Sequence, residues 1–278
     1  MEKHLAVTGE VGHEEEPRGK TLHEEVHEES SSPMISLKAE PLFSIGSFSV
    51  TNSIVLAFVT LLVLCSIGLA FKKKVSLIPK LFQSLVEVAV EGFLKIMDSV
   101  LGDRNKSEKY LPLVATIFFF IMVSNWLGLL PGVGSIGVNI IHEGHETFTP
   151  VFRAPAADLN FTIAIAILAV FGVNLSGVFA IGFFKHFKKF FTLKNPIYTF
   201  VGILEFFSEF AKIVSFSFRL FGNIFAGEVL LIIVGFLVPY VVPLPFLMLE
   251  IFVGFIQAFI FAMLTLVFIA GAIVEEAH

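Results

Sequence analysis

The hydrophobic positions of this chain are gathered into long unbroken runs. Residues 54–71, 111–130 and 159–184 each contain no Asp, Glu, Lys or Arg. A helix of about 20 apolar residues crosses the hydrocarbon core of a bilayer, which is about 30 Å thick. These runs therefore predict three membrane-spanning helices.

The last third of the chain has a longer apolar pattern. Residues 197–238 contain no proline over about forty positions, which as a helix would measure about 60 Å. Such a segment must be steeply tilted, bent or broken. Pro239, Pro243 and Pro245 predict a turn, and residues 246–273 return as a second long helix. We expect an all-α polytopic membrane protein with five crossing helices, the last two forming a steeply tilted hairpin.

One segment has a different pattern of polar and apolar residues. Residues 77–101 carry their polar side chains at i, i+3, i+4 and i+7 spacing, which predicts an amphipathic helix with an apolar opposite face. We expect it to lie along the membrane surface or against neighbouring helices. Its polar stripe comprises Lys80, Gln83, Ser84, Glu87, Glu91, Lys95 and Asp98.

Two polar segments flank the predicted spans. Residues 1–50 begin with nine Glu and four His within the first 32 positions, which predicts a disordered, solvated tail preceding a membrane domain at 51–278. Residues 131–157 are expected to form an exposed polar loop. Its His142 and His145 are three apart, unlike the HExxH zinc arrangement, so no metal site is predicted. Asp158 then has the position of an N-cap for the next helix.

Composition and charge agree with a membrane protein and add an orientation. Hydrophobic residues make up 55% of the 278 residues and charged residues only 15%, against about 25% charged in soluble proteins. The single cysteine, Cys65, allows no intrachain disulfide. Lys72–Lys74 and the lysines from Lys185 to Lys194 flank different spans, and basic flanks remain cytoplasmic. We therefore expect the N-terminus outside, without a signal peptide, and the C-terminus in the cytoplasm.

Arg219 is the charged residue of the last hairpin that most needs an explanation, because no Asp or Glu lies within eight residues of it to balance its charge. An ionisable group at membrane depth costs at least about 2.5–3.5 kcal/mol. A guanidinium does not lose its proton under any physiological condition. Glu228 is nine residues away on the opposite helix face, so it is not expected to pair with Arg219. The spacing leaves two explanations: Arg219 snorkels or pairs with a Glu elsewhere in this chain, or a partner subunit supplies a carboxylate.

Four segments carry a resemblance to a known family. FRLFGNIFAGEVLL at 218–231 resembles the signature of the F-type ATP synthase a subunit, the stator protein that faces the rotating c-ring. QAFIFAMLTLVFI at 257–269 resembles the C-terminal helix of that family. NWLGLLPG at 125–132 and ADLN at 157–160 are similar to its other marks. The resemblance covers about residues 50–278 in order, with the hairpin at 196–278 as its ion-translocating part.

The resemblance implies a mechanism in which Arg219 faces the membrane-buried carboxylate of each passing c subunit. Two offset half-channels would deliver and remove protons. By position in the motifs, the outer half-channel would use Glu228, Asn223, Glu250 and Gln257, and the inner one Glu205. Asp158 would either help at the outer entrance or only cap its helix. Glu209 and Lys212 have the spacing of a simple ion pair.

One departure from the family pattern concerns the transported ion. Family members often have one His and one carboxylate across the positions of Glu228 and Glu250, whereas this chain has two Glu. Two close carboxylates would titrate together and would also suit a cation, so Na⁺ remains an alternative to the H⁺ that we favour.

The resemblance also implies the setting in which the chain works. The expected partners are c-ring subunits, peripheral-stalk b subunits and the rest of the complex in a bacterial cell inner membrane. No cofactor and no active site of its own are expected. A self-contained secondary transporter is the alternative function, although it predicts repeated halves that this sequence lacks. A membrane scaffold is a weaker alternative, because it leaves Arg219 unexplained.

Overall fold

The computed structural model describes residues 39–45, 48–74, 81–142, 145–184 and 196–274. All of them belong to one compact unit, Ile35–His278. The expected tail over residues 1–38 and the lysines from Lys185 to Lys194 lie outside the described residues. The α-helices in the described part are α2 (Asn52–Lys74), α3 (Leu81–Leu101), α4 (Arg104–Gly128), α5 (Leu159–Ile181), α7 (Pro196–Leu237) and α8 (Pro243–Val274).

Five of these helices are long and apolar enough to cross a membrane, and they confirm the predicted fold class. They contain the apolar runs expected from the sequence, including the overlong one, since α7 has 42 residues. The spanning segments are Asn52–Lys72, Arg104–Gly128, Leu159–Ile181, Thr199–Leu237 and Pro243–Ile273.

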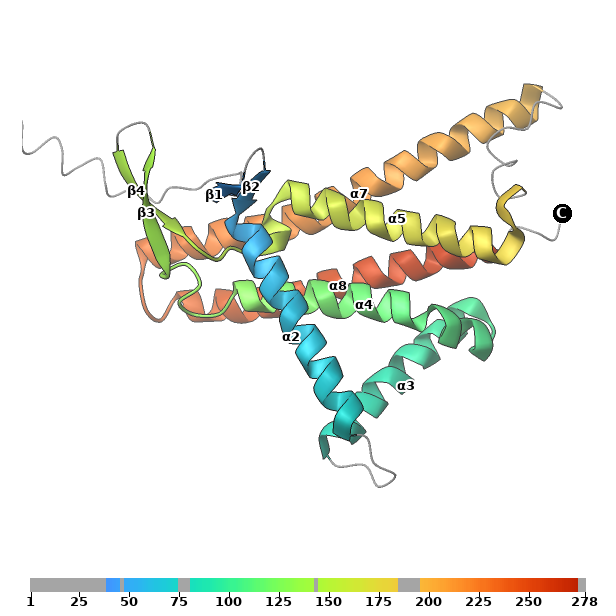
Figure 1. The fold of residues 1–278 in the computed structure, drawn as a ribbon, viewed down its shortest axis with the longest axis horizontal. Helices are drawn as coiled ribbons and strands as arrows, with labels where there is room; N and C mark the ends of the chain where they lie inside the picture. The colour runs from blue at the N-terminus through green and yellow to red at the C-terminus, as the bar shows by residue number, and fades with distance from the viewer. Residues whose placement is uncertain (1–38, 46–47, 75–80, 143–144, 185–195, 275–278) are drawn as a thin grey trace, which may run out of the picture. The chain divides into compact units, whose positions relative to one another are not determined.

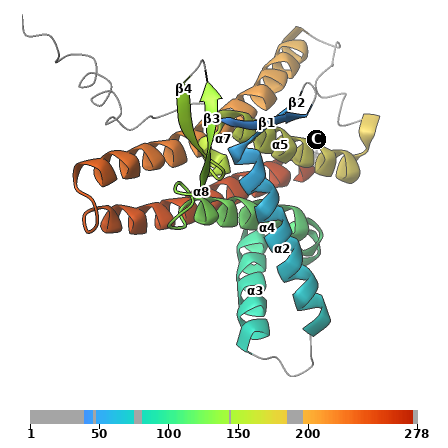
Figure 2. The same ribbon diagram turned by 60° about the vertical axis from the view of Figure 1, so that its left-hand side comes forward.

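Helix α3 is the amphipathic element, and it is not among the candidate spans. Its apolar face packs against α4, and Leu94, Met97 and Leu101 are buried there. Figures 1 and 2 show α3 folding back beside the start of α4. The prediction that this helix packs against neighbouring helices is therefore confirmed.

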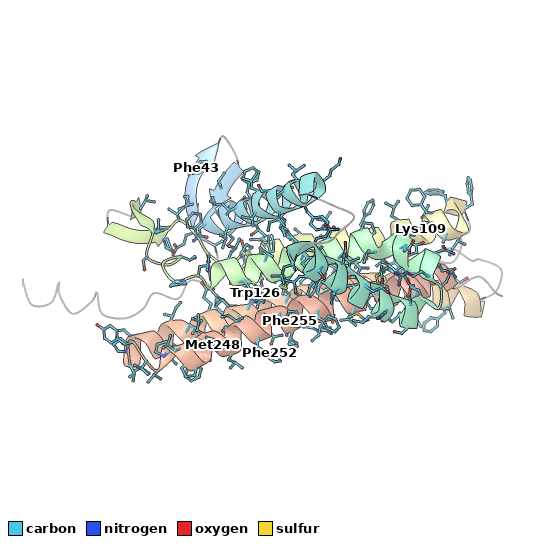
Figure 3. The ribbon with its side chains drawn as sticks, turned by 90° about the horizontal axis from the view of Figure 1, so that it is seen from below. Phe43, Lys109, Trp126, Met248, Phe252 and Phe255 are labelled. Carbon is cyan, nitrogen blue, oxygen red and sulfur yellow. The ribbon has the colours of Figure 1, made fainter. Side chains whose placement is uncertain are left out.

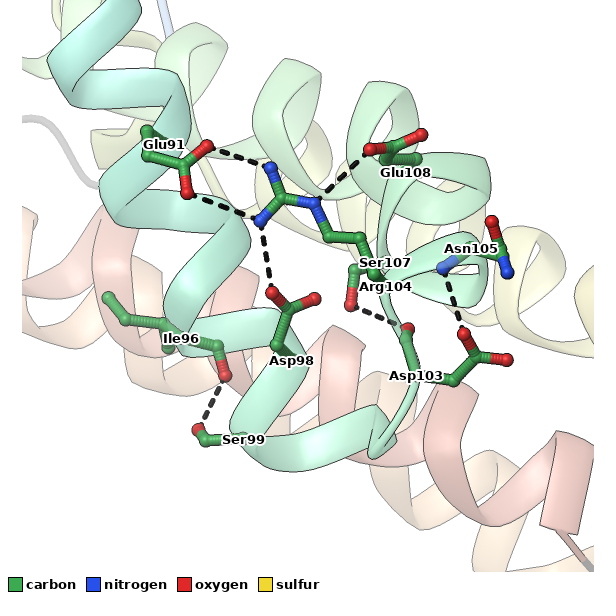
Figure 4. A network of polar contacts seen from close by, with 9 residues as sticks. All are labelled: Glu91, Ile96, Asp98, Ser99, Asp103, Arg104, Asn105, Ser107 and Glu108. Atoms are coloured by element: carbon green, nitrogen blue, oxygen red, sulfur yellow. Dashed lines mark hydrogen bonds and ion pairs between the residues drawn. The ribbon is translucent and has the colours of Figure 1, made fainter.

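The turn between α3 and α4 is fixed by polar contacts (Figure 4). The side chain of Asp103 accepts a hydrogen bond from the backbone N–H of Asn105 and so caps α4. The guanidinium of Arg104 pairs with Glu91 at 2.7 Å, with Asp98 at 3.0 Å and with Glu108 at 3.2 Å. One arginine therefore joins the polar stripe of α3 to the first turns of α4.

Two short β-hairpins replace parts of the segments that the sequence assigned to tail and loop. Strands β1 (Pro41–Ile45) and β2 (Phe48–Thr51) pair antiparallel directly before α2. The expectation of disorder up to residue 50 is therefore wrong for this last part. Strands β3 (Gly137–His142) and β4 (His145–Pro150) pair antiparallel within the expected loop. The Val, Ile, Thr and Phe residues of these strands favour this pairing.

The core lies where α4, α5, α7 and α8 meet. Small residues such as Ala166, Ala169, Ala258 and Ala262 are completely buried and let the helices approach closely. The rings of Phe216 in α7 and Phe261 in α8 lie 4.7 Å apart, centroid to centroid. The two helices of the hairpin are thus packed together along their middle parts.

The hairpin turns at a strained residue beside the predicted prolines. Tyr240 has φ of 84°, a left-handed conformation unusual for a residue with a side chain. Helix α8 then begins at Pro243, three residues before the predicted start, because proline suits the first turn of a helix. Figure 2 shows α7 and α8 running back along each other from this turn.

Candidate functional site

Arg219 lies on an exposed part of α7. Its Nη2 is 3.4 Å from Ser215 Oγ, one helical turn earlier. Within the part of the chain that the structure describes, no acidic side chain forms an ion pair with Arg219. The neighbouring Asn223 donates to the carbonyl oxygen of Arg219 at 2.9 Å and is also exposed. Both side chains are therefore displayed on an outer surface of the described helices.

Glu228 pairs with an arginine that the sequence analysis did not single out. Nε of Arg153 is 3.1 Å from Oε1 of Glu228, and its Nη2 is 3.2 Å from Oε2. The arginine side chain is 8% exposed and the glutamate side chain 27%. The available signal was that Arg153 is the only Lys or Arg between Lys109 and Lys185. It was overlooked because it belongs to a segment interpreted as an exposed loop.

Glu250 is on the returning helix α8, close to the part of α7 that carries Glu228. Its side chain is buried, with 6% exposure. A methyl group placed on Gly227 would overlap with the Glu250 carboxyl group, so this carboxyl sits directly on the backbone of α7. The carboxyl group of Glu250, on α8, thus lies against the residue of α7 that precedes Glu228.

A polar seam joins α4 to the same part of α8. Asn125 donates from Nδ2 to the Gly254 carbonyl at 3.3 Å, and Trp126 donates from Nε1 to the Ile251 carbonyl at 3.0 Å. Trp126 and Phe255 are labelled on these two helices in Figure 3. Gln257, one turn beyond Gly254, is half-buried. The NWLGLLPG segment therefore anchors the helix that carries Glu250 and Gln257.

Asp158 has the capping position that the sequence predicted. Its side chain accepts a hydrogen bond from the backbone N–H of Asn160 at 3.0 Å and is buried. It follows directly after η1 (Pro155–Ala157), a short 3₁₀ helix that packs against α2, α4, α5 and α7. The N-cap function is confirmed, whereas a contribution to an ion entrance stays a prediction.

The other half of α7 carries a second polar group. Glu209 and Lys212 pair at 2.7 Å, as their spacing predicted, and Asn174 of α5 donates to Glu209 at 3.1 Å. The ammonium group of Lys212 lies 4.7 Å from the centre of the Phe268 ring. Glu205 is half-buried, one turn before this pair. These residues tie α7 to its neighbours α5 and α8.

The polar groups are arranged along α7 in a definite order. Glu205 precedes Arg219 by 14 residues and Glu228 follows it by nine, which correspond to about 21 Å and about 13 Å of helix. Arg219, which has no ion pair with any residue that the structure describes, therefore lies between two separate polar regions of one helix. No group of three or more possible metal ligands occurs among the described residues.

Comparison with known proteins identifies the family. The family model described as ATP synthase A chain matches residues 53–270. The chain belongs to the ATP synthase A chain family. This match confirms the resemblance drawn from the FRLFGNIFAGEVLL segment, and it spans Arg153 and every candidate site residue.

Similar proteins of the A chain family occur in two bacterial genera. ATP synthase subunit a of Campylobacter jejuni serotype O:6 is 37% identical over 207 residues, which cover 74% of this chain and 83% of the relative. ATP synthase subunit a of Helicobacter pylori strain Shi470 is 32% identical over 237 residues, which cover 85% and 95%. A multi-pass membrane protein of the A chain family is thus established by sequence and by the five spanning helices.

Proposed function

We propose that this chain is the stator a subunit of an F-type ATP synthase and couples transmembrane proton flow to rotation of a c-ring. The observation that carries the proposal is the exposed Arg219, which has no carboxylate partner among the described residues. A permanent cation in an apolar setting is costly unless a counter-charge approaches it. A carboxylate on a passing c subunit would supply that counter-charge.

The proposed chemistry follows from the charge of Arg219. A membrane-buried carboxyl of a c subunit faces lipid only in its neutral form. Opposite Arg219 its ionised form is favoured, so it releases its proton there. As the ring turns further, the carboxylate takes up a proton from the other side of the membrane. Each elementary charge that crosses 100 mV yields about 2.3 kcal/mol, which drives the rotation.

We assign two half-channels on either side of Arg219. Glu228, Glu250, Asn223 and Gln257 form the outer one in this proposal, with Asp158 at its entrance, and Glu205 belongs to the inner one. The separation along α7 supports this division, because the two groups lie on opposite sides of Arg219. Arg219 also repels protons and so opposes direct leakage between the half-channels.

The remaining parts of the proposal concern the assembly. The partners are c-ring subunits, peripheral-stalk b subunits and the other subunits of the complex, and the chain contributes no active site of its own. The N-terminus lies outside a bacterial inner membrane and the C-terminus lies in the cytoplasm. This orientation is supported by Lys72 and Lys109, which stand at the ends of the first two spans, because basic flanks remain cytoplasmic. The transported ion is H⁺.

The test is ATP-driven proton uptake by the whole complex reconstituted in vesicles. Arg219→Ala should abolish proton uptake while this chain remains present in the purified complex at its normal amount. Retained uptake by this variant would refute the proposed function. If the complex transports Na⁺ instead of H⁺, the vesicles would show Na⁺-dependent uptake. This result would correct only the identity of the transported ion.

A further inference from the structure

Arg153 has no part in the proposed function so far, yet it makes a buried fork-shaped contact with Glu228. Nε and Nη2 approach the two carboxylate oxygens separately, at 3.1 Å and 3.2 Å. Such two-point contacts fix the orientation of a carboxylate as well as its position. The Glu228 side chain therefore points toward the segment before α5.

The backbone around Arg153 is held firmly in place. A methyl group placed on Gly128, the last residue of α4, would overlap with Ala154, so these two backbones are in close contact. On the other side of Ala154, the three residues of η1 are buried. Asn52 of α2 donates to the carbonyl oxygen of Pro150 at 3.3 Å. Helices α2 and α4 thus hold the segment that carries Arg153.

The two carboxyl groups near this point occupy different sides of α7. Glu250 rests on Gly227, whereas Glu228 is the next residue and projects about 100° further round the helix, toward Arg153. Like charges at close range disfavour each other. The two-point contact with Arg153 can therefore hold the Glu228 carboxylate on its own side of the helix.

We propose that Arg153 is a positioning residue that holds the Glu228 carboxylate on the η1-facing side of α7, apart from Glu250. This inference rests on the proposed function, because it assumes that Glu228 belongs to the ion path. Glu250 has no hydrogen bond or ion pair with any described residue, so it is the carboxyl left free to exchange protons. Arg153 thereby gives two chemically identical side chains different functions: Glu228 is held in place, and Glu250 exchanges protons.

The experiment is a double-mutant cycle on the reconstituted complex, with the initial rate of ATP-driven proton uptake per ATP hydrolysed as the readout. Arg153→Gln should lower this rate by about tenfold, an effect common when a partner that orients a working group is removed. Arg153→Lys keeps the charge and should retain more of the rate than Arg153→Gln. In a Glu228→Gln background, Arg153→Gln should change the rate by no more than about twofold, because the residue through which it acts is already altered.

Two results would overturn the inference. One is a wild-type rate in Arg153→Gln, and the other is the same fold-loss in both backgrounds, which would show that Arg153 acts only on folding. Arg104→Gln is the matched control, since it also removes an arginine paired with carboxylates and should leave the rate unchanged. If Arg153→Gln does not assemble, Arg153→Lys measured in both backgrounds gives the same comparison.

The same preparation separates this inference from the proposed function. Uptake that survives Arg219→Ala refutes the proposed function. Uptake lost in Arg219→Ala but normal in Arg153→Gln refutes only the assignment of Arg153.

Discussion

The carboxyl group of Glu250 lies directly against Gly227 of the neighbouring helix, at a place where no side chain fits between them. This contact brings a buried acidic group to within one residue of Glu228 on α7. A glycine is needed there because of space, since Gly227 lies inside a regular helix. The relationship explains how a glutamate 22 residues further along the chain comes next to the residue that precedes Glu228.

Gly227→Ala should displace the Glu250 carboxyl group and lower ATP-driven proton uptake. In an exposed helix interior a Gly→Ala change would stabilise the helix by about 1 kcal/mol through helix propensity. A loss of proton uptake in Gly227→Ala would therefore result from the overlap with Glu250. Gly235→Ala, on the same helix with open space around it, is the control and should leave uptake unchanged. Equal uptake in both variants would show that Glu250 can move without consequence.

Arg219→Lys should fail to support proton uptake even though it keeps a positive charge. The compact ammonium group cannot reproduce the planar fork of donors, and a lysine can lose its proton in an apolar environment. Measuring uptake between pH 6 and pH 9 tests this explanation. Near-normal uptake across that range would mean that charge alone is sufficient at this position.

Lys212→Met should destabilise the complex more than the double variant Lys212→Met/Glu209→Gln. Removing one partner of this half-buried pair leaves Glu209 with only its Asn174 contact among the described residues, at a cost below the about 3–5 kcal/mol of a fully buried pair, whereas removing both charges leaves little to compensate. The thermal midpoint of the purified complex measures the difference. If the double variant were less stable than the single variant, the pair would stabilise the complex by something other than mutual charge compensation. Neither variant should abolish proton uptake.

Protonation of the acidic side chains around Arg104 should loosen the α3–α4 turn. The hydrogen bond from Arg104 lowers the pKa of Glu91 below its ordinary 4.5. Ser107 and then Arg104 lower the pKa of Asp98 below its ordinary 3.8. Because both pKa values are depressed in the fold, this stabilisation is complete above those ordinary values and is lost as pH falls through the lowered ones.

Spin-label distances between the exposed faces of α3 and α4, with Cys65 replaced by Ser, measure this change. The distances should broaden as the pH falls through the lowered pKa values of Glu91 and Asp98, where both carboxylates take up protons. In Arg104→Gln they should already be broad at neutral pH. A distribution that stays narrow after both carboxylates are protonated would show that apolar packing alone holds the turn.

The helices were predictable from the sequence because each long apolar run has no other stable structure in a bilayer. The Asp158 cap and the Glu209–Lys212 pair were also predictable, since both depend on residues close together along the chain. The Arg153–Glu228 pair was not, because its members are 75 residues apart. The one hint in the sequence was that Arg153 is the only Lys or Arg between Lys109 and Lys185.

The β-hairpins were missed for a related reason. Strand pairs of four to six residues are short, and the polar and proline residues near them are equally typical of loops. The contact of Glu250 with Gly227 also depends on the packing of α7 against α8, which no local pattern specifies. Sequence periodicity thus predicted the elements, while the side-chain neighbours at the site required the fold.

The length of α7 has a consequence for the order of events along it. A helix of 42 residues is about 63 Å long, twice the hydrocarbon thickness, so it tilts beyond the mean of about 20°, bends or extends past the hydrocarbon. In a straight helix of this length that stayed within the hydrocarbon, successive turns would be displaced sideways more than in depth. Glu205, Arg219 and Glu228 would then lie at different lateral positions in the membrane plane as well as at different depths.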